Sequence, residues 1–301
     1  MVRFFSRAST GARAAQLPVT SHGRLEMHLL NPEAAPFIGI LGPLSVYSSK
    51  CRTPSARKPR NVLAMLLAHA DQILPVPVLV SELWDNDPPA SSLTTLQTYI
   101  LNLRKMFVEA TGQSAAEVSR NVLVTKGGGY VFQSDGAVLD VREYHRLRSA
   151  GCASLDVRDD LKGIAQLSEA LQLWRGPALI DVPLGRVLES KRHELVESRL
   201  TTIEYLVGAK LRQGMYLEVL STLAALTVEN PLHEGLQAKY MRALYLSGRR
   251  AQALEVFHRL RRNLIDELGL EPMPQVQRVH HAILNDEIDF DDDLQLARPS
   301  G

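Results

Sequence analysis

The strongest constraint on the fold is a repeat near the end of the chain. Gly214 and Gly248 are 34 residues apart, and the same offset relates other small and apolar residues. The related pairs are Ala209 with Ala243, Leu220 with Leu254, Leu223 with Phe257, and Leu226 with Leu260. A repeat of this length with helical spacing of its apolar residues is typical of antiparallel helix pairs that stack on one another.

The whole chain after about Asp140 has this helical character. Amphipathic segments rich in Leu and Ala occupy residues 141–150, 158–174, 184–212, 215–228, 232–247, 249–267 and 273–287. We therefore predict an all-α domain of tetratricopeptide-like helix pairs over residues 140–287. The acidic residues 288–301 are predicted to be a disordered tail. A length of 301 residues leaves room for a second domain before the helices.

The chain opens with a segment that has no clear periodicity. Residues 1–36 contain scattered arginines and no acid before Glu26, and we predict a disordered extension there. A secretory signal is not indicated, because its apolar core is missing. Translation starts at Met1 and at Met27 are both compatible with this segment.

Residues 37–135 are predicted to form a small domain of mixed α and β structure. Two short apolar runs separated by Gly42-Pro43 indicate a small sheet, and three amphipathic helices follow within residues 58–107. Two runs rich in β-forming residues then flank the sequence KGGG, which begins at Lys126, as in a hairpin. The predicted fold is thus mostly α, with an α+β domain followed by an all-α domain.

The third predicted helix, SSLTTLQTYILNLRKMF at residues 91–107, has two unequal faces. One apolar stripe is formed by Leu93, Leu96, Ile100, Leu103 and Phe107. The opposite face carries Thr94, Thr95, Thr98, Asn102 and Lys105. No acid occurs between Pro88 and Glu109, although Glu favours helices more than Thr or Asn does. Ser91 or Ser92 is in place to cap this helix.

Composition and motifs exclude several classes of protein. Hydrophobic residues make up 45% of the chain, yet no apolar stretch is long enough to span a membrane. Cys51 and Cys152 lie in unrelated contexts, which argues against a disulfide or zinc site and favours a reducing cytoplasm. His-Glu-x-x-His, Gly-x-Ser-x-Gly and phosphate-loop motifs are absent, and adjacent His280 and His281 face different sides of a helix. We expect no enzyme, no metal and no cofactor.

A winged helix-turn-helix accounts for the first domain. In this fold the second helix of the helix-turn-helix lies in the major groove, and here that helix is residues 91–107. Its Thr and Asn side chains are of the kind that reach base edges, whereas an acid would repel phosphates. Residues 1–135 hold 13 Lys and Arg against 9 Asp and Glu, a weak indication of an anionic partner. Lys126 at the hairpin tip is placed as a wing would be, and Lys58 and Arg60 are placed to meet backbone phosphates.

Periodicity alone leaves two interpretations of residues 91–107 open. A plain amphipathic helix with its threonines in solvent fits about as well as a base-reading helix. Leu101 lies on the outward face, where it is compatible with contact to thymine methyl groups, with contact to another copy, or with no function.

Longer stretches resemble one family. FIGILGPLSV, LVSELWDNDPPASSLTTLQTYILNLRKMF, VLVTKGGGYVF, LDVREYHRLRSAG and ALYLSGRRAQALEVFHRLRRNLIDELGLEPMPQVQRVHHAIL together resemble the Streptomyces antibiotic regulatory protein family, from about Phe37 to Glu287. The resemblance implies an OmpR-type winged helix joined to a bacterial transcriptional activation domain. It also implies that pairs of copies bind direct repeats near the promoter −35 region and recruit RNA polymerase to antibiotic biosynthetic clusters. A helical-repeat scaffold whose winged helix binds protein is the alternative.

The resemblance implies roles for individual residues. The matches TLQTY and LRK imply DNA contact by Thr94, Thr95, Thr98, Arg104 and Lys105. Asn102 shares their face. Many relatives carry a basic or an amide residue at this position, so this chain lacks the positive charge that some of them have there. In WDNDPP, Asp85 and Asp87 fit a loop that faces the polymerase and fit a plain polar turn nearly as well. The chain stops after its helical half, so we expect no ATP control of the kind found in larger relatives.

Overall fold

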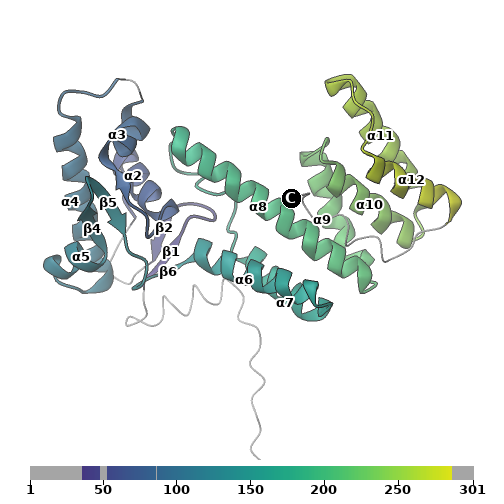
Figure 1. Ribbon diagram of the computed structural model, residues 1–301, viewed down its shortest axis with the longest axis horizontal. Helices are drawn as coiled ribbons and strands as arrows, with labels where there is room; N and C mark the ends of the chain where they lie inside the picture. Colours follow the sequence, from purple (N-terminus) through teal and green to yellow (C-terminus); the bar gives the residue numbers. More distant parts are fainter. Residues whose placement is uncertain (1–35, 48–52, 86, 287–301) are drawn as a thin grey trace, which may run out of the picture.

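The computed structural model describes residues 36–47, 53–85 and 87–286. The predicted N-terminal extension, apart from residue 36, and the predicted acidic tail lie outside these residues. Over the described residues the molecule is elongated, with the mixed α and β part at one end and the helix pairs at the other (Figure 1). The predicted fold class, a winged helix followed by a helical domain, is confirmed.

In its described residues, the winged helix contains two small sheets and four helices. The described elements, in chain order, are β1 (Phe37–Gly39), β2 (Ser45–Tyr47), α2 (Arg57–Ala68), β3 (Leu74–Pro75), α3 (Val76–Trp84), α4 (Ser92–Thr111), α5 (Ala115–Asn121), β4 (Leu123–Lys126) and β5 (Gly129–Phe132). In the first sheet β1 pairs antiparallel with β2 and parallel with β6 (Val138–Leu139), and in the second sheet β5 lies between β3 and β4.

The short helix α5 is an element that the sequence analysis did not predict. Its N-cap Ser114 accepts from the backbone N–H of Glu117, and the Glu117 carboxylate accepts from the Ser114 N–H in return. This reciprocal arrangement has a sequence signature, Ser-x-x-Glu, which was available in the sequence as Ser114-Ala-Ala-Glu117.

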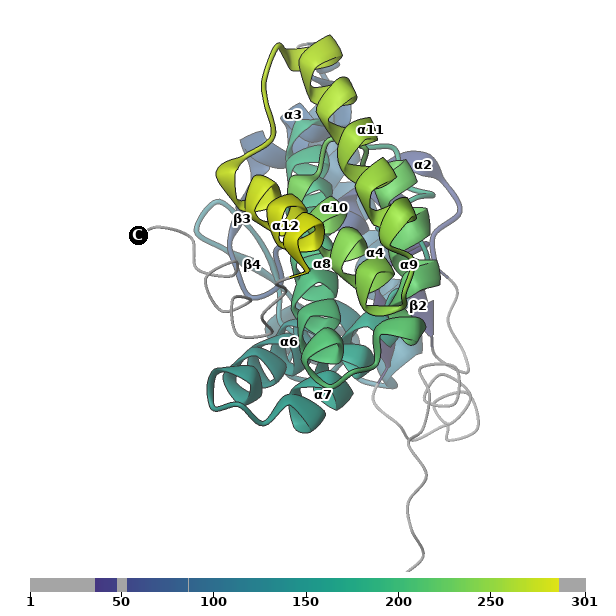
Figure 2. The same cartoon turned by 90° about the vertical axis from the view of Figure 1, so that its right-hand side faces the viewer.

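The remaining chain is helical and follows the predicted segments. It contains α6 (Asp140–Asp156), α7 (Asp160–Gln172), α8 (Arg186–Arg212), α9 (Tyr216–Glu229), α10 (Glu234–Leu246), α11 (Arg250–Leu268) and α12 (Pro274–Asn285). Figure 2 looks along the molecule from this end, with α11 and α12 in front. The glycines of the repeat have equivalent positions: Gly214 follows α8 and Gly248 follows α10, both with a left-handed φ, of 73° and 78°. The predicted repeat is confirmed.

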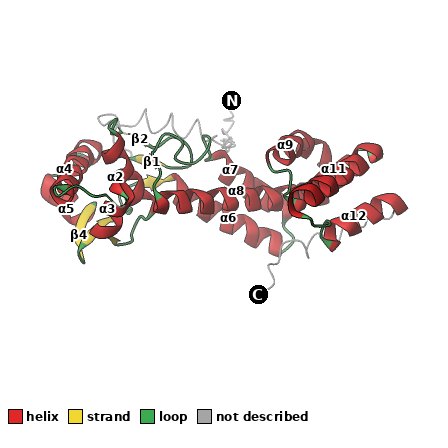
Figure 3. Ribbon diagram, turned by 90° about the horizontal axis from the view of Figure 1, so that it is seen from above, coloured by secondary structure: helices red, strands yellow, loops and turns green. Residues whose placement is uncertain are grey.

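The hydrophobic core does not divide where the winged helix ends. One cluster joins buried residues of α2, α4 and the sheets to Tyr144 of α6, Trp174 after α7, and Leu188 and Leu195 of α8. A second cluster packs the later part of α8 against α9 to α12. Helix α8 has 27 residues and is therefore about 40 Å long, so it runs from one cluster into the other (Figure 3). The winged helix is thus anchored on the helical half.

Candidate DNA-binding surface

Helix α4 lies at the end of the molecule farthest from α11 and α12 (Figures 1 and 3). Its core-facing side is formed by Leu96, Ile100, Leu103, Met106 and Phe107, all buried. The prediction that Leu93 belongs to this stripe is wrong, because its side chain is 56% exposed. Burial of Met106 rotates the stripe away from Leu93, which sits in the first turn where Ser92 is buried instead.

The outward side of α4 is exposed and contains no acid before Glu109 in the last turn. Its exposed side chains are Leu93, Thr94, Gln97, Thr98, Leu101, Asn102 and Lys105, and Thr95 is half-buried beside them. The Thr98 hydroxyl donates to the Thr94 carbonyl over 3.0 Å, so its proton is used within the helix. Sequence reasoning did not assign Gln97, although it lies one turn before Leu101. Its exposed amide has the donor and acceptor with which Gln reads adenine.

The wing is a tight hairpin beside α4, as predicted. Lys126 pairs with Gly129 across the turn, and Gly127 and Gly128 have φ of 57° and 73°. Two successive left-handed residues are what a type I′ turn requires. Gly129 has another role, since a Cβ there would lie 2.2 Å from the Leu74 carbonyl oxygen of β3. The Lys126 side chain is exposed at the tip.

Arg104 links α4 to the wing. Its Nε donates to the Leu123 carbonyl over 3.0 Å, and its Nη2 donates to the Thr125 hydroxyl over 2.9 Å. Both acceptors belong to β4. The half-buried guanidinium that the resemblance assigned to DNA therefore fixes the position of the hairpin relative to α4.

The loop between α3 and α4 carries the two acids singled out in the sequence. Asp85 and Asp87 are both exposed, and the Asp87 N–H donates to the Trp84 carbonyl over 3.1 Å. Ser91 is the N-cap of α4, but its side chain makes no capping hydrogen bond. The prediction that a serine side chain caps this helix is wrong.

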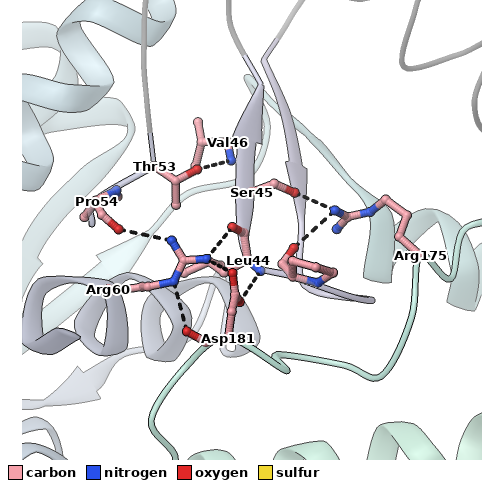
Figure 4. A network of polar contacts seen from close by, with 9 residues as sticks. Leu44, Ser45, Val46, Thr53, Pro54, Arg60, Arg175 and Asp181 are labelled. Atoms are coloured by element: carbon pink, nitrogen blue, oxygen red, sulfur yellow. Dashed lines mark hydrogen bonds and ion pairs between the residues drawn. The ribbon is translucent and has the colours of Figure 1, made fainter. Parts of the chain in front are cut away.

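Lys58 and Arg60, at the start of α2, have different surroundings from those expected. The Lys58 ammonium lies 4.5 Å from the centre of the Trp84 ring. Arg60 donates to the carbonyls of Leu44 and Pro54 over 2.9 and 3.1 Å, and it pairs with the Asp181 carboxylate (Figure 4). Its side chain is only 13% exposed. The structure thus gives the Arg60 guanidinium partners within the protein, whereas the expectation placed it at a backbone phosphate.

The contacts of Arg60 belong to a polar junction between the winged helix and the segment that precedes α8. The Asp181 carboxylate also accepts from the Leu44 N–H over 2.8 Å, and the Asn61 amide donates to the Pro183 carbonyl over 2.6 Å. Arg175 donates to the Pro43 carbonyl and to the Ser45 hydroxyl, over 3.1 and 2.8 Å (Figure 4).

A buried carboxylate, that of Asp140, joins α6 to the residues that follow β1. Asp140 accepts from the backbone N–H groups of Ile40 and Leu41, each over 2.9 Å, and Arg175 donates to it over 3.2 Å. Burial raises the pKa of Asp140, because the charged form loses its hydration, while these donors oppose the rise. The carboxylate thereby ties the chain just after the first strand of the winged helix to the first helix of the helical part.

A third carboxylate caps the long helix α8. Glu82 of α3 is only 7% exposed and accepts from the N–H groups of Gly185, Val187 and Leu188, at 2.8, 2.8 and 3.3 Å. Such N–H groups have no partner within their own helix, and a negative charge suits that end of the helix dipole. A Cβ on Gly185 would lie 2.6 Å from the Glu82 carboxyl carbon, so glycine permits the approach. Sequence reasoning missed Glu82, because its signal lies in a partner about a hundred residues away.

The described residues contain no group of three or more His, Cys, Asp or Glu side chains arranged to hold a metal ion. His280 and His281 have ring centres 5.8 Å apart, and His280 stacks on Phe257 at 3.8 Å. Burial and the nearby His258 and His281 lower the pKa of His280. Within the same part of the chain, no helix is both long and apolar enough to cross a membrane.

Two family models match consecutive parts of the chain. Residues 53–132 match a model described as the C-terminal part of transcriptional regulatory proteins, and residues 139–284 match the bacterial transcriptional activator domain. Together they cover the winged helix and the helical part.

Similar proteins share this combination. The regulatory protein DnrI of Streptomyces peucetius is 43% identical over 248 residues, which are 82% of this chain and 91% of DnrI. The transcriptional regulator RedD of Streptomyces coelicolor is 35% identical over 249 residues, which are 82% of this chain and 70% of RedD. The solved structure of Mycobacterium tuberculosis EmbR in complex with a low affinity phosphopeptide has a TM-score of 0.79 and 29% identity, and the match covers 88% of this chain and 68% of that one.

Proposed function

The chain belongs to the Streptomyces antibiotic regulatory protein family, and from that premise we propose how it acts as a DNA-binding transcriptional activator of an antibiotic biosynthetic gene cluster. Helix α4 enters the major groove and the hairpin of β4 and β5 lies along the backbone. Residues 37–135 bind DNA, and residues 140–287 form the activating part. Catalysis has no role in this proposal.

One observation carries the proposal: over residues 92–108 the outward side of α4 is exposed and free of acids, and it lies beside an exposed wing lysine. Thr94, Thr95, Thr98 and Asn102 offer small polar groups to base edges. Lys105 and Lys126 supply positive charge on the helix and at the hairpin tip, where contacts to phosphate position the protein without reading sequence.

Two other cations have supporting roles. Lys58 lies half-buried at the start of α2 and is a candidate for a backbone phosphate near Trp84. Arg104 positions the wing through its bonds to β4 and contacts DNA with the remaining part of its guanidinium. Arg60 is left out, because its donors are used at the junction.

The partners follow from the family. Pairs of this chain bind direct repeats near the −35 region of a promoter in the cytoplasm, and the complex recruits RNA polymerase. The exposed loop with Asp85 and Asp87 lies next to α4 and is a candidate surface for the polymerase.

Binding specificity tests the DNA-binding proposal. In a gel-shift titration on promoters from its own gene neighbourhood, the chain should prefer promoter DNA over random competitor. We expect Lys126→Ala to weaken binding to all sequences and Thr95→Ala or Asn102→Ala to change which sequences bind. Absence of any preference would refute the proposal, and identical behaviour of the three variants would refute the assignment of the reading face.

Transcription in vitro tests the polymerase surface. The Asp85→Asn, Asp87→Asn double variant should bind promoter DNA as tightly as the wild type but give less transcript. Asp135→Asn, an exposed acid elsewhere on the winged helix, is the matched control and should activate normally. Full activation by the double variant would show that the loop is a plain polar turn and is not needed for contact with the polymerase.

A further inference from the structure

The outward side of α4 contains an apolar side chain at its centre. Leu101 is 52% exposed and lies among Gln97, Thr98 and Lys105, which are its neighbours one turn away along the helix. Leu93, by contrast, lies in the first turn at the edge of this face. A single exposed leucine is ordinary on a protein surface. Leu101 is of interest because it lies among the proposed base-reading residues.

The polar groups around Leu101 leave few donors for bases. Thr98 donates its hydroxyl proton to the Thr94 carbonyl, so it offers a base an acceptor or its methyl group. Lys105 is a point charge on a flexible stem that suits phosphate. Gln97 and Asn102 are therefore the amides available for hydrogen bonding, and the middle of the face is apolar.

In the major groove one base presents an apolar group, the 5-methyl of thymine. Resting on the proposed function, we infer that Leu101 is a specificity residue that contacts a thymine methyl group in each bound repeat. The surrounding charge supports this choice over a contact between copies, because no acid of α4 precedes Glu109 and the charged residues one turn after Leu101, Arg104 and Lys105, are both positive. One leucine is also far smaller than the surface that a stable protein interface buries.

The contact predicts a measurable coupling between one side chain and one methyl group. A binding site is first selected from a random DNA library with the wild-type chain, and each thymine is then replaced singly by deoxyuridine. This replacement removes the methyl group and keeps the hydrogen-bonding groups. Burial of one methyl is worth about 0.8 kcal/mol, so at one position the wild type should lose about fourfold in affinity. Leu101→Ala should bind the thymine and uracil versions within about 1.5-fold of each other.

Leu217→Ala is the matched control, because Leu217 is 65% exposed on α9, away from the proposed DNA surface. This variant should keep the fourfold difference between thymine and uracil. Leu101→Ala should also unfold at the wild-type temperature, since the side chain is half-exposed and Ala favours helix.

Four results would overturn the inference. A selected site that tolerates every uracil, or a Leu101→Ala variant that keeps the wild-type difference, would refute the methyl contact alone. If Leu101→Ala kept the wild-type difference between thymine and uracil and also changed the oligomeric state, Leu101 would contact another copy of the chain instead. Failure to select any sequence would refute the proposed function, and the inference with it.

Discussion

The outward side of α4 and the junction before α8 are both polar surfaces of the winged helix, but they use their side chains in opposite ways. At the junction, Arg60, Arg175 and Glu82 are largely buried, and their hydrogen bonds go to carbonyls, carboxylates and N–H groups of the same chain. On α4, Thr94, Asn102 and Lys105 point into solvent. Charge alone therefore does not distinguish the proposed DNA surface from the junction, whereas the exposure of the polar side chains does.

The junction also explains why the two halves act together. Three carboxylates, those of Glu82, Asp140 and Asp181, each accept backbone N–H groups from the opposite half, around a shared hydrophobic core. Breaking the buried pairings of Glu82 and Asp140 leaves unsatisfied groups, which is costly. Under the proposal that α4 binds DNA, this junction would fix the direction of α8 relative to the promoter and present the later helices in one orientation.

The largest effect is expected from the cap of α8. Glu82→Ala leaves three N–H groups without their carboxylate and should lower the free energy of unfolding by about 3 kcal/mol. Ser114→Ala, which removes the exposed cap of α5, is the matched control and should cost about 1 kcal/mol. Urea denaturation measures both. Equal losses would mean that the buried cap contributes no more to stability than an exposed one.

Arg60→Ala separates a junction arginine from a DNA-binding one. Loss of its bonds to Leu44, Pro54 and Asp181 should lower the free energy of unfolding by about 2 kcal/mol, while the dependence of DNA affinity on salt stays unchanged. Fluorescence anisotropy with labelled promoter DNA, at several salt concentrations, gives the slope. A shallower slope would place Arg60 on the DNA after all.

Lys126→Ala should show the reverse pattern. The side chain is exposed, so urea denaturation should be unchanged within about 0.5 kcal/mol. If Lys126 meets one phosphate, the slope of log affinity against log salt should fall by about 0.9, and the affinity lost between 50 and 200 mM salt should be about 3.5-fold smaller. An unchanged slope would exclude the wing tip from the interface.

A substitution at the link between α4 and the wing tests the role of Arg104. Arg104→Lys keeps the charge but loses the two-point contact with Leu123 and Thr125, which should cost about 1 kcal/mol of stability. Lys105→Arg is the control next to it and should be neutral in urea. If both substitutions left the free energy of unfolding unchanged, the bonds from Arg104 to β4 would not stabilise the winged helix.

Features with a local cause could be predicted from the sequence. The helices of the second half follow from their apolar spacing, and Gly214, Gly248 and the wing glycines mark turns that need left-handed residues. The boundaries of the buried face were less reliable. Leu93 continues the spacing of Leu96 and Ile100 but is exposed, because tertiary packing rotates the stripe toward Met106.

Features with a distant partner could not be predicted. Nothing near Glu82 in the sequence signals the N-terminus of α8, and Arg60 resembles a phosphate-binding arginine until Asp181 is placed beside it. Arg104 shows the same ambiguity, since its spacing on α4 fits the DNA face while its bonds go to β4. Side-chain roles that depend on tertiary neighbours need the structure.

The central claim is that the outward side of α4 reads the sequence of the promoter. Its most direct test is the ratio of affinities for promoter and random DNA at one salt concentration, measured for the wild type and for the triple variant Thr94→Ala, Thr98→Ala, Asn102→Ala. Alanine favours helix, so α4 should stay folded. We expect a wild-type ratio of about 10³ or more to fall by at least tenfold, with binding to random DNA retained. An unchanged ratio would contradict the claim.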